Sequence, residues 1–494
     1  MNVSNQKYRN IIKASGLIGF LQVGQMFFSV IKSKVTAVYI GAVGLGALGV
    51  FTSTMNIFYS LASLGLMYST TIKIAKYNTN NSEKYVNKIF TLSQYIIFTS
   101  SLLITILVII FSKDLSVYFF NNDNHSFDFI LLSFTIIFFS FDKINYASLQ
   151  GLHKINQLVL STLFGGFISV ISSISLYYFF HERGIVPSII IGVIVNFFIG
   201  IHYIRKNGIK YTKTRIKDFY LFGVPMINLG LVMLVGSLFG FIVTSSVNIF
   251  IIKYGSISDV GLYNAGISIT TQYVTLIFTS ISLDFFPRLS AISSDNKDVE
   301  IMVNDQVLIS LIVLFPILLG MALSSKFLIE ILLTKEFFQL NKFVKITSIF
   351  LNFQSLAFVI SNIPLAKADK KIFFIWNSIF PGVCALFFFT LGYKFFGLNG
   401  LAIGSGIVNV LHFVSMAIVC KIRYNYKINS EVYKLLFLST LCIILTFLGF
   451  EFGNTFISYL IGCLFFIFSL IYSFIKLNKL MGFNFLFSNL IKKS

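Results

Sequence analysis

Uninterrupted apolar runs of about 20 residues recur between residues 11 and 475, and they limit the possible folds of this chain more than any other feature. A helix of about 20 apolar residues spans the roughly 30 Å hydrocarbon core of a bilayer. The composition agrees, because 56% of the 494 residues are hydrophobic and only 11% are charged, whereas soluble domains carry about 25% charged residues. The runs lack the alternating pattern of an outer-membrane barrel. We therefore expect an all-α integral membrane protein.

The runs predict about fourteen transmembrane helices, the first of them an uncleaved signal anchor. We expect an N-terminal six-helix lobe at 1–204, a cytoplasmic basic linker at 205–221, a C-terminal six-helix lobe at 222–420, and two extra helices with a cytoplasmic tail at 421–494. The expected spans lie near 11–31, 44–72, 88–111, 127–150, 157–180, 186–204, 222–252, 262–286, 304–324, 343–366, 372–393, 398–420, 435–450 and 455–475.

The formal net charge of +20 bears on both topology and partners. No basic soluble domain is predicted that would hold a duplex, so we expect no nucleic-acid partner and assign the surplus to cytoplasmic loops. With the N-terminus in the cytoplasm, 28 of the 38 Lys and Arg residues fall on the cytoplasmic side and 10 on the other. This asymmetry predicts a multi-pass protein of the bacterial inner membrane with both termini in the cytoplasm.

The chain also contains a weak internal repeat at a nearly constant offset. The spacing of Tyr39 and Gly46 recurs at Tyr254 and Gly261, an offset of 215 residues, and Lys73 meets Arg288 at the same offset. Six predicted spans separate the equivalent residues, and an even number of spans places them on the same side of the membrane. The two halves are therefore predicted to be parallel repeats. Transporters built from such repeats bind their substrate near the interface of the halves and expose it to each side in turn. The repeat therefore favours a transporter.

Several segments resemble bacterial polysaccharide flippases. The stretch Lys34 to Phe51, with its glycines at 41, 44, 46 and 49, resembles the start of the Wzx-type O-antigen flippases, which belong to the multidrug/oligosaccharidyl-lipid/polysaccharide exporter (MOP) superfamily. Further similar segments are Asp259 to Ala265, Phe286 to Ser290, Asn304 to Gln306 and Gln150 to Lys154. The resemblance implies two six-helix lobes in a V-shaped bundle, like that of the MATE multidrug exporters, plus two C-terminal helices.

The same resemblance implies a function. It predicts a flippase that moves an undecaprenyl-pyrophosphate-linked oligosaccharide, such as an O-antigen repeat unit for lipopolysaccharide, to the outer leaflet. Partners would be this substrate, membrane lipids, and a polysaccharide polymerase with its chain-length regulator. Two alternatives stay open: a MATE-type multidrug or cation antiporter, and a membrane-embedded polysaccharide polymerase, which the short external loops disfavour. We expect no cofactor, with coupling to H⁺ or Na⁺ as an open alternative.

Cations near the ends of spans are the candidates for holding a pyrophosphate. They are Lys32 and Lys34 at the exit of the first span, and Lys73 and Arg288 at the cytoplasmic ends of two others. A charge in lipid is costly, so these groups either line a wet cavity or extend to the headgroups. Both interpretations stay open at this stage.

A polar stripe on the first span points to the lining of such a cavity. Gln22 and Gln25 lie three residues apart, and Ser29 and Lys32 continue the same helical face. Amide side chains in a bundle bond either to neighbouring helices or to sugar hydroxyls. We take Gln22 and Gln25 as candidate substrate contacts.

Two carboxylates near membrane depth are candidates for ion coupling. Asp284 precedes Pro287, which frees backbone carbonyls of its helix. Asp142 has an alternative role as the ion-pair partner of Lys143 or Lys154 at the cytoplasmic surface. No catalytic motif and no metal-ligand spacing occurs in the sequence, so we expect neither a catalytic residue nor a bound metal.

The cation hypothesis makes one direct prediction. Lys34→Ala and Arg288→Ala should each impair complementation of a deletion strain, because each removes a charge expected to face the anionic substrate, while the protein level in membranes stays normal. Surface-glycan blots measure the first quantity and immunoblots the second. Full activity of both variants would refute the hypothesis.

Overall fold

The structure is a computed structural model that describes residues 3–80, 82–453 and 455–481. Side chains are described from Leu21 onward, except at position 232, at several positions between 272 and 284, and at both ends of the last helix. Helices make up nearly all of the described chain, and these residues contain no strand. Nine helical stretches of the described chain have the length and composition to cross a membrane. The two longest, Lys370–Tyr424 and Ile155–Lys206, each contain two of the predicted spans, and Leu21–Ser63 overlaps parts of the first two. The predicted all-α membrane fold is confirmed.

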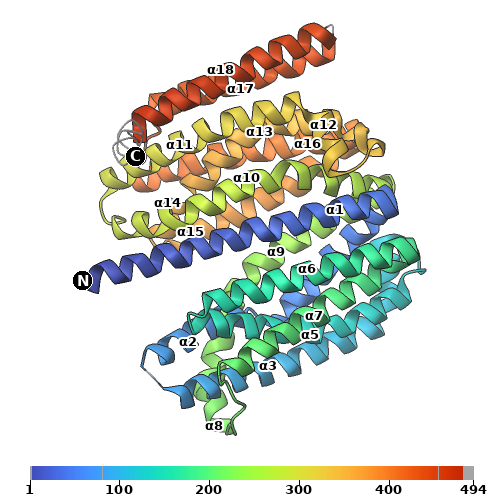
Figure 1. The fold of residues 1–494 in the computed structure, drawn as a ribbon, viewed down its shortest axis with the longest axis vertical. Helices are drawn as coiled ribbons and strands as arrows, with labels where there is room; N and C mark the ends of the chain where they lie inside the picture. Colours follow the sequence, from blue (N-terminus) through green and yellow to red (C-terminus); the bar gives the residue numbers. More distant parts are fainter. Residues whose placement is uncertain (1–2, 81, 454, 482–494) are drawn as a thin grey trace, which may run out of the picture. The chain divides into compact units, whose positions relative to one another are not determined.

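The chain divides into two compact units, Met1–Asn264 and Ala265–Ser494. In the first unit, the bundle places α3, α5, α7 and α6 side by side, and α1 packs on α6 and α9 (Figure 1). The helices of this unit are α1 (Val3–Ser63), α2 (Leu66–Thr79), α3 (Glu83–Ile110), α4 (Ser112–Phe120), α5 (Ser126–Gly151), α6 (Ile155–Phe180), α7 (Ile185–Lys206), α8 (Ile216–Asp218) and α9 (Val224–Tyr254), and α10 (Ile257–Ala291) begins in it.

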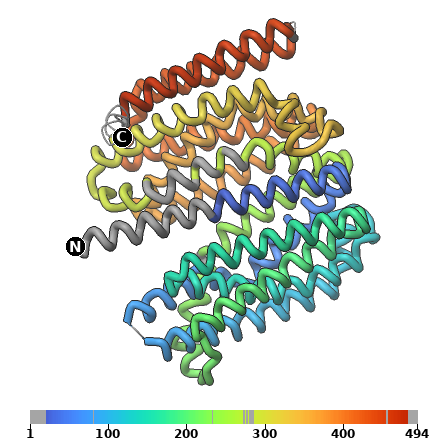
Figure 2. Tube along the Cα trace, in the orientation of Figure 1, coloured from blue at the N-terminus to red at the C-terminus, as the bar shows by residue number. Residues whose placement is uncertain are grey.

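The second unit carries the remaining helices. Here α13 packs against α16, and α11 packs against α13 and against the final pair, α17 and α18, which also contact each other (Figure 2). This pair accounts for the two extra C-terminal helices expected from the sequence. The helices are α11 (Asn296–Leu323), α12 (Ser325–Leu332), α13 (Asn341–Ile360), α14 (Asn362–Ala366), α15 (Lys370–Phe374), α16 (Phe380–Tyr424), α17 (Ser430–Phe452) and α18 (Thr455–Met481).

Apolar side chains define an inside and an outside in the first unit. On α3, Phe98, Leu102 and Ile106 recur at four-residue spacing and are exposed, as expected for a face in contact with lipid. The opposite face of α3 buries a core cluster where α2, α3, α5 and α9 meet, and α1, α6 and α7 contribute further members. Its fully buried members include Leu66, Ile74, Ile89, Ile97, Ile144, Leu149 and Met226.

One predicted span is interrupted. The sequence predicts a single helix at 44–72, but α1 ends at Ser63 and α2 begins at Leu66. Gly65 adopts φ +64°, a left-handed conformation that favours glycine. A Cβ atom at this position would lie 2.1 Å from the carbonyl oxygen of Gly230 on α9. The break therefore lets α2 and α9 approach at backbone distance.

The basic segment after α7 is an ordered strap, residues 209–215, that docks on α3. The backbone N–H of Lys210 donates to Oδ1 of Asn87 at 3.1 Å, and that of Thr212 donates to Oγ1 of Thr91 at 3.0 Å. Lys88 and Asp218 form a salt bridge of 2.8 Å beyond the strap. The strap is thus part of the first unit, and its basic side chains face outward. They are Lys210, Lys213 and Arg215.

Because the backbone near the start of α2 lies close to α9, we expect the stability of the protein to depend on where a methyl group is added along α9. Gly230→Ala should destabilise the protein by about 1–3 kcal/mol, the usual cost of overpacking, because its Cβ would lie 2.3 Å from the carbonyl oxygen of Leu64. Gly240→Ala, on the same helix and with no atom within 4 Å of the new Cβ, is the matched control and should leave stability unchanged or slightly higher. Thermal unfolding in detergent compares the two, and equal behaviour would contradict the packing argument.

Candidate functional site

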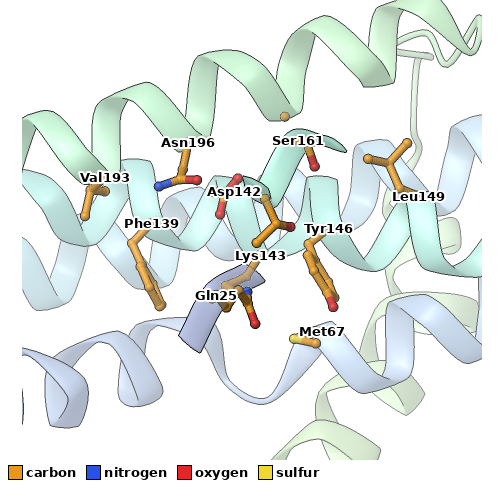
Figure 3. A pocket seen from close by; sticks show the side chains of 12 residues that line it. Gln25, Met67, Phe139, Asp142, Lys143, Tyr146, Leu149, Ser161, Val193 and Asn196 are labelled. Carbon is orange, nitrogen blue, oxygen red and sulfur yellow. The ribbon is translucent and has the colours of Figure 1, made fainter. Parts of the chain in front are cut away.

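The first unit contains a polar cavity of about 410 Å³ between α1, α2, α5, α6 and α7 (Figure 3). This volume falls within the range of small-molecule sites. The cavity is lined by Gln25, Met67, Phe139, Asp142, Lys143, Tyr146, Leu149, Ser161, Thr162, Val193, Asn196 and Gly200.

Helix α5 supplies the largest share of the lining. Phe139, Lys143 and Tyr146 are spaced four and three residues apart, so they project from one face of the helix. Asp142 lies beside them, nine residues before the end of α5 at Gly151, which is about 14 Å along the helix axis. The polar face of α5 therefore lies well inside the helix rather than at its C-terminal end, which the sequence predicts to be cytoplasmic.

The ammonium group of Lys143 is held by aromatic rings instead of by a carboxylate. Its Nζ lies 4.6 Å from the ring centroid of Phe139 and 6.0 Å from that of Tyr146. Phe139 in turn stacks on Tyr59, with centroids 4.0 Å apart and planes tilted by 13°. A cation over an aromatic face gains about 1–2 kcal/mol when partly desolvated. Lys143 is thus positioned in the cavity with its charge available to a ligand.

Asp142 lies beside Gly200 of α7 and is similarly available. A Cβ at Gly200 would lie 3.0 Å from Oδ1 of Asp142, so a larger residue here would press on the carboxylate. Within the described part of the chain, Asp142 has no salt bridge within 4 Å and no hydrogen bond. Behind it, Gln94 donates to Oδ1 of Asn145 at 3.2 Å. The cavity therefore contains one carboxylate and one ammonium that do not neutralise each other by direct contact.

Helices α6 and α7 complete the wall with hydroxyl and amide groups. Ser161 and Thr162 both donate to the carbonyl oxygen of Leu158, at 2.9 and 2.8 Å, so their oxygens remain as acceptors. The amide of Asn196 donates to the carbonyl oxygen of Gly192 at 2.7 Å, which fixes its orientation. These intrahelical bonds use the hydroxyl protons of Ser161 and Thr162 and one of the two amide protons of Asn196, so the two hydroxyl groups remain as acceptors.

Two of the residues proposed from the sequence meet at this cavity, Gln25 and Asp142. Other members of the predicted set in the first unit, Lys32, Lys34 and Lys73, are half-buried and are absent from the lining found among the described residues. Gln22 is half-buried too, and its Oε1 is buried without a hydrogen-bond partner in the described chain. The polar stripe on the first span thus reaches the cavity only through Gln25.

The second unit carries the other two predicted residues. Arg288, near the end of α10, is exposed. Asp284, the other coupling candidate, has a side chain outside the described residues. Their predicted roles remain predictions.

Sequence reasoning missed most of the α5 face. Lys143 was considered only as an ion-pair partner for Asp142, and Phe139 and Tyr146 were not singled out. The signal was present in the spacing, because residues 139, 142, 143, 146 and 149 share one helical face that mixes charge and aromatic rings. Among the residues that the structure describes, no three His, Cys, Asp or Glu side chains gather to hold a metal ion.

The chain resembles one protein family in sequence and several solved structures in fold. A family model described as "Polysaccharide biosynthesis protein" matches residues 42–342, which include the lining residues from Met67 to Gly200. The chain belongs to this family. No curated protein matches the chain by sequence.

Solved structures show that the family member has the fold of MOP-superfamily transporters. The lipid II flippase MurJ, in an inward closed conformation, has a TM-score of 0.70 with 20% identity, over 95% of this chain and 100% of its own. An inward-facing multidrug-resistance MATE transporter has a TM-score of 0.68 with 15% identity, and the match covers 84% of this chain and 99% of the transporter. A MOP transporter from Pyrococcus furiosus has a TM-score of 0.61 with 14% identity, and the match covers 84% of this chain and 96% of that transporter. The fold resemblance predicted from the sequence is confirmed.

The cavity predicts a difference in solvent access along α6. In a background with the native cysteines replaced, Ser161→Cys should react with a water-soluble methanethiosulfonate reagent, because the side chain lines the cavity. Ser173→Cys, on the same helix but fully buried, is the control and should remain unmodified. Mass spectrometry of the intact protein reads both. Equal protection of the two cysteines would show that water does not enter the cavity.

Proposed function

We propose that this family member is a flippase that carries an undecaprenyl-pyrophosphate-linked oligosaccharide from the cytoplasmic to the outer leaflet of the bacterial inner membrane by alternating access. The observation that carries the proposal is the family match over residues 42–342. It covers nearly all of a polar, charge-bearing cavity inside a membrane-spanning unit. A charged side chain in a membrane span is costly and therefore rare, and where one occurs it commonly marks a transport pathway.

The cargo proposed is the repeat unit of an O-antigen for lipopolysaccharide or of a similar surface polysaccharide. MurJ, a neighbour in fold, is named as a flippase of lipid II, so a lipid-linked saccharide is compatible with this fold. The pyrophosphate would be held by the cations proposed from the sequence, Lys32, Lys34, Lys73 and Arg288. A polysaccharide polymerase and its chain-length regulator would receive the product, and both termini would lie in the cytoplasm.

A MATE-type cation antiporter is the second candidate function. It is favoured by the multidrug transporter among the fold neighbours and by the carboxylate of Asp142 in the cavity. Lys143 in the same cavity weighs against it, since an ammonium repels a cationic cargo. In either transporter, coupling to H⁺ or Na⁺ would require an acidic group, and Asp142 and Asp284 are the candidates.

Gene deletion separates the two functions. A deletion strain should lose its surface polysaccharide, accumulate the lipid-linked repeat unit in the inner membrane, and keep its resistance to cationic drugs. Glycan blots, lipid extraction and growth assays measure these three quantities, and complementation by the wild-type gene is the control. Normal surface glycan together with new drug sensitivity would refute the flippase and support the antiporter.

A further inference from the structure

We infer that the cavity of the first unit binds an uncharged pyranose ring of the glycan, and that the pyrophosphate of the same substrate is held elsewhere. The inference rests on the proposed flippase function and specifies which chemical part of the substrate this cavity recognises. It follows from the charge, the hydrogen-bonding groups and the shape of the lining.

The charge of the lining sums to zero. Asp142 and Lys143 are the charged residues among those that line the cavity, and they carry opposite signs. Two unit charges 4 Å apart interact by roughly 4 kcal/mol at an effective dielectric constant of 20. A pyrophosphate bound here would gain about this much from Lys143 and lose a similar amount to Asp142. A lipophilic cation would meet the same cancellation with the signs reversed, so neither ion is favoured.

The hydrogen-bonding groups suit a ligand rich in hydroxyls. Asp142 offers carboxylate oxygens, and Ser161 and Thr162 offer hydroxyl oxygens whose protons already go to the Leu158 carbonyl. Lys143, also in the lining, offers donors. A sugar hydroxyl donates to one group and accepts from another at the same time, so adjacent hydroxyls can bridge the carboxylate and the ammonium. Hydrogen bonds to charged groups are about twice as strong as neutral ones.

The shape and the apolar part of the lining fit a sugar ring as well. A pyranose has an apolar C–H face that packs on an aromatic side chain. Phe139 has Tyr59 stacked on it and Lys143 at 4.6 Å from its centroid, whereas Lys143 lies 6.0 Å from the centroid of Tyr146. Tyr146 is therefore the more accessible ring for contact with the sugar. Met67, Leu149 and Val193 extend the apolar wall. A cavity of about 410 Å³ has room for roughly one or two pyranose rings.

Protection of a cysteine in the wall tests the inference directly. The purified full-length Ser161→Cys protein in nanodiscs is labelled with the methanethiosulfonate reagent in the presence of methyl pyranosides, inorganic pyrophosphate or tetraphenylphosphonium. We expect the pyranosides to slow labelling and the two ions to have no effect. A cysteine at Lys206, which is exposed outside the cavity, controls for effects on the reagent.

Further substitutions in the Ser161→Cys protein identify which side chains the protection by pyranosides depends on. Tyr146→Ala should abolish the protection, and Asp142→Asn should weaken it about tenfold, the effect of losing one charge-assisted hydrogen bond. Tyr95→Ala and Asp114→Asn, at exposed positions of the same unit, are the matched controls and should retain it. Protection by pyrophosphate alone, by the cation alone or by none of the probes would overturn the inference, as would protection that survives Tyr146→Ala.

The experiment also separates this inference from the proposed function. If the deletion strain loses its surface glycan but pyrophosphate protects the cysteine, the sugar site is wrong and the flippase stands. If the strain keeps its glycan while pyranosides protect the cysteine, the flippase is wrong and the sugar site stands.

Discussion

The absence of hydrogen-bonding partners in the bilayer core is the constraint from which the rest of this structure follows. Each backbone N–H and C=O must be satisfied within its own segment, so the chain crosses as helices, and irregular backbone is tolerated only against other protein. The break at Gly65 obeys this rule, because it lies against Gly230 of a neighbouring helix. The same rule makes a polar side chain in a span expensive unless it faces an interior space.

The cavity places two charged side chains inside the membrane-spanning unit without a direct ion pair between them. Asp142 and Lys143 are sequence neighbours, yet the lysine lies over aromatic rings and the carboxylate lies beside Gly200. A direct ion pair would have lowered the energy of both charges and left little for a ligand to gain. Local intrahelical bonds of Ser161 and Thr162 use up their donors. The wall is therefore preorganised to favour a neutral, multiply hydroxylated ligand over an ion.

Much of the fold was predictable from the sequence, because membrane-spanning helices leave a strong local signal in hydropathy. The site was predictable only in part. Gln25 and Asp142 were found from their rarity in apolar runs, whereas Phe139 and Tyr146 are aromatic residues in a chain that is 17% aromatic, so nothing in their type marks them. Their spacing places them on the same face of α5 as Asp142 and Lys143, but which helices that face meets is a tertiary property that periodicity along one helix does not contain. The glycine break at residues 64–65 was missed for the same reason, since its partner lies on α9.

The strap on α3 has a consequence for the timing of assembly. Its acceptors, Asn87 and Thr91, precede the N–H groups that they bind by 123 and 121 residues. At a synthesis rate of 5–20 residues per second, α3 waits roughly 6–25 s for these partners to emerge. Asn87 and Thr91 lie near the start of α3, in the predicted cytoplasmic half, where water can serve them in the meantime. The helices of the first unit up to α7 are therefore synthesised before the strap can bind α3, and the strap emerges only as α9 is being made.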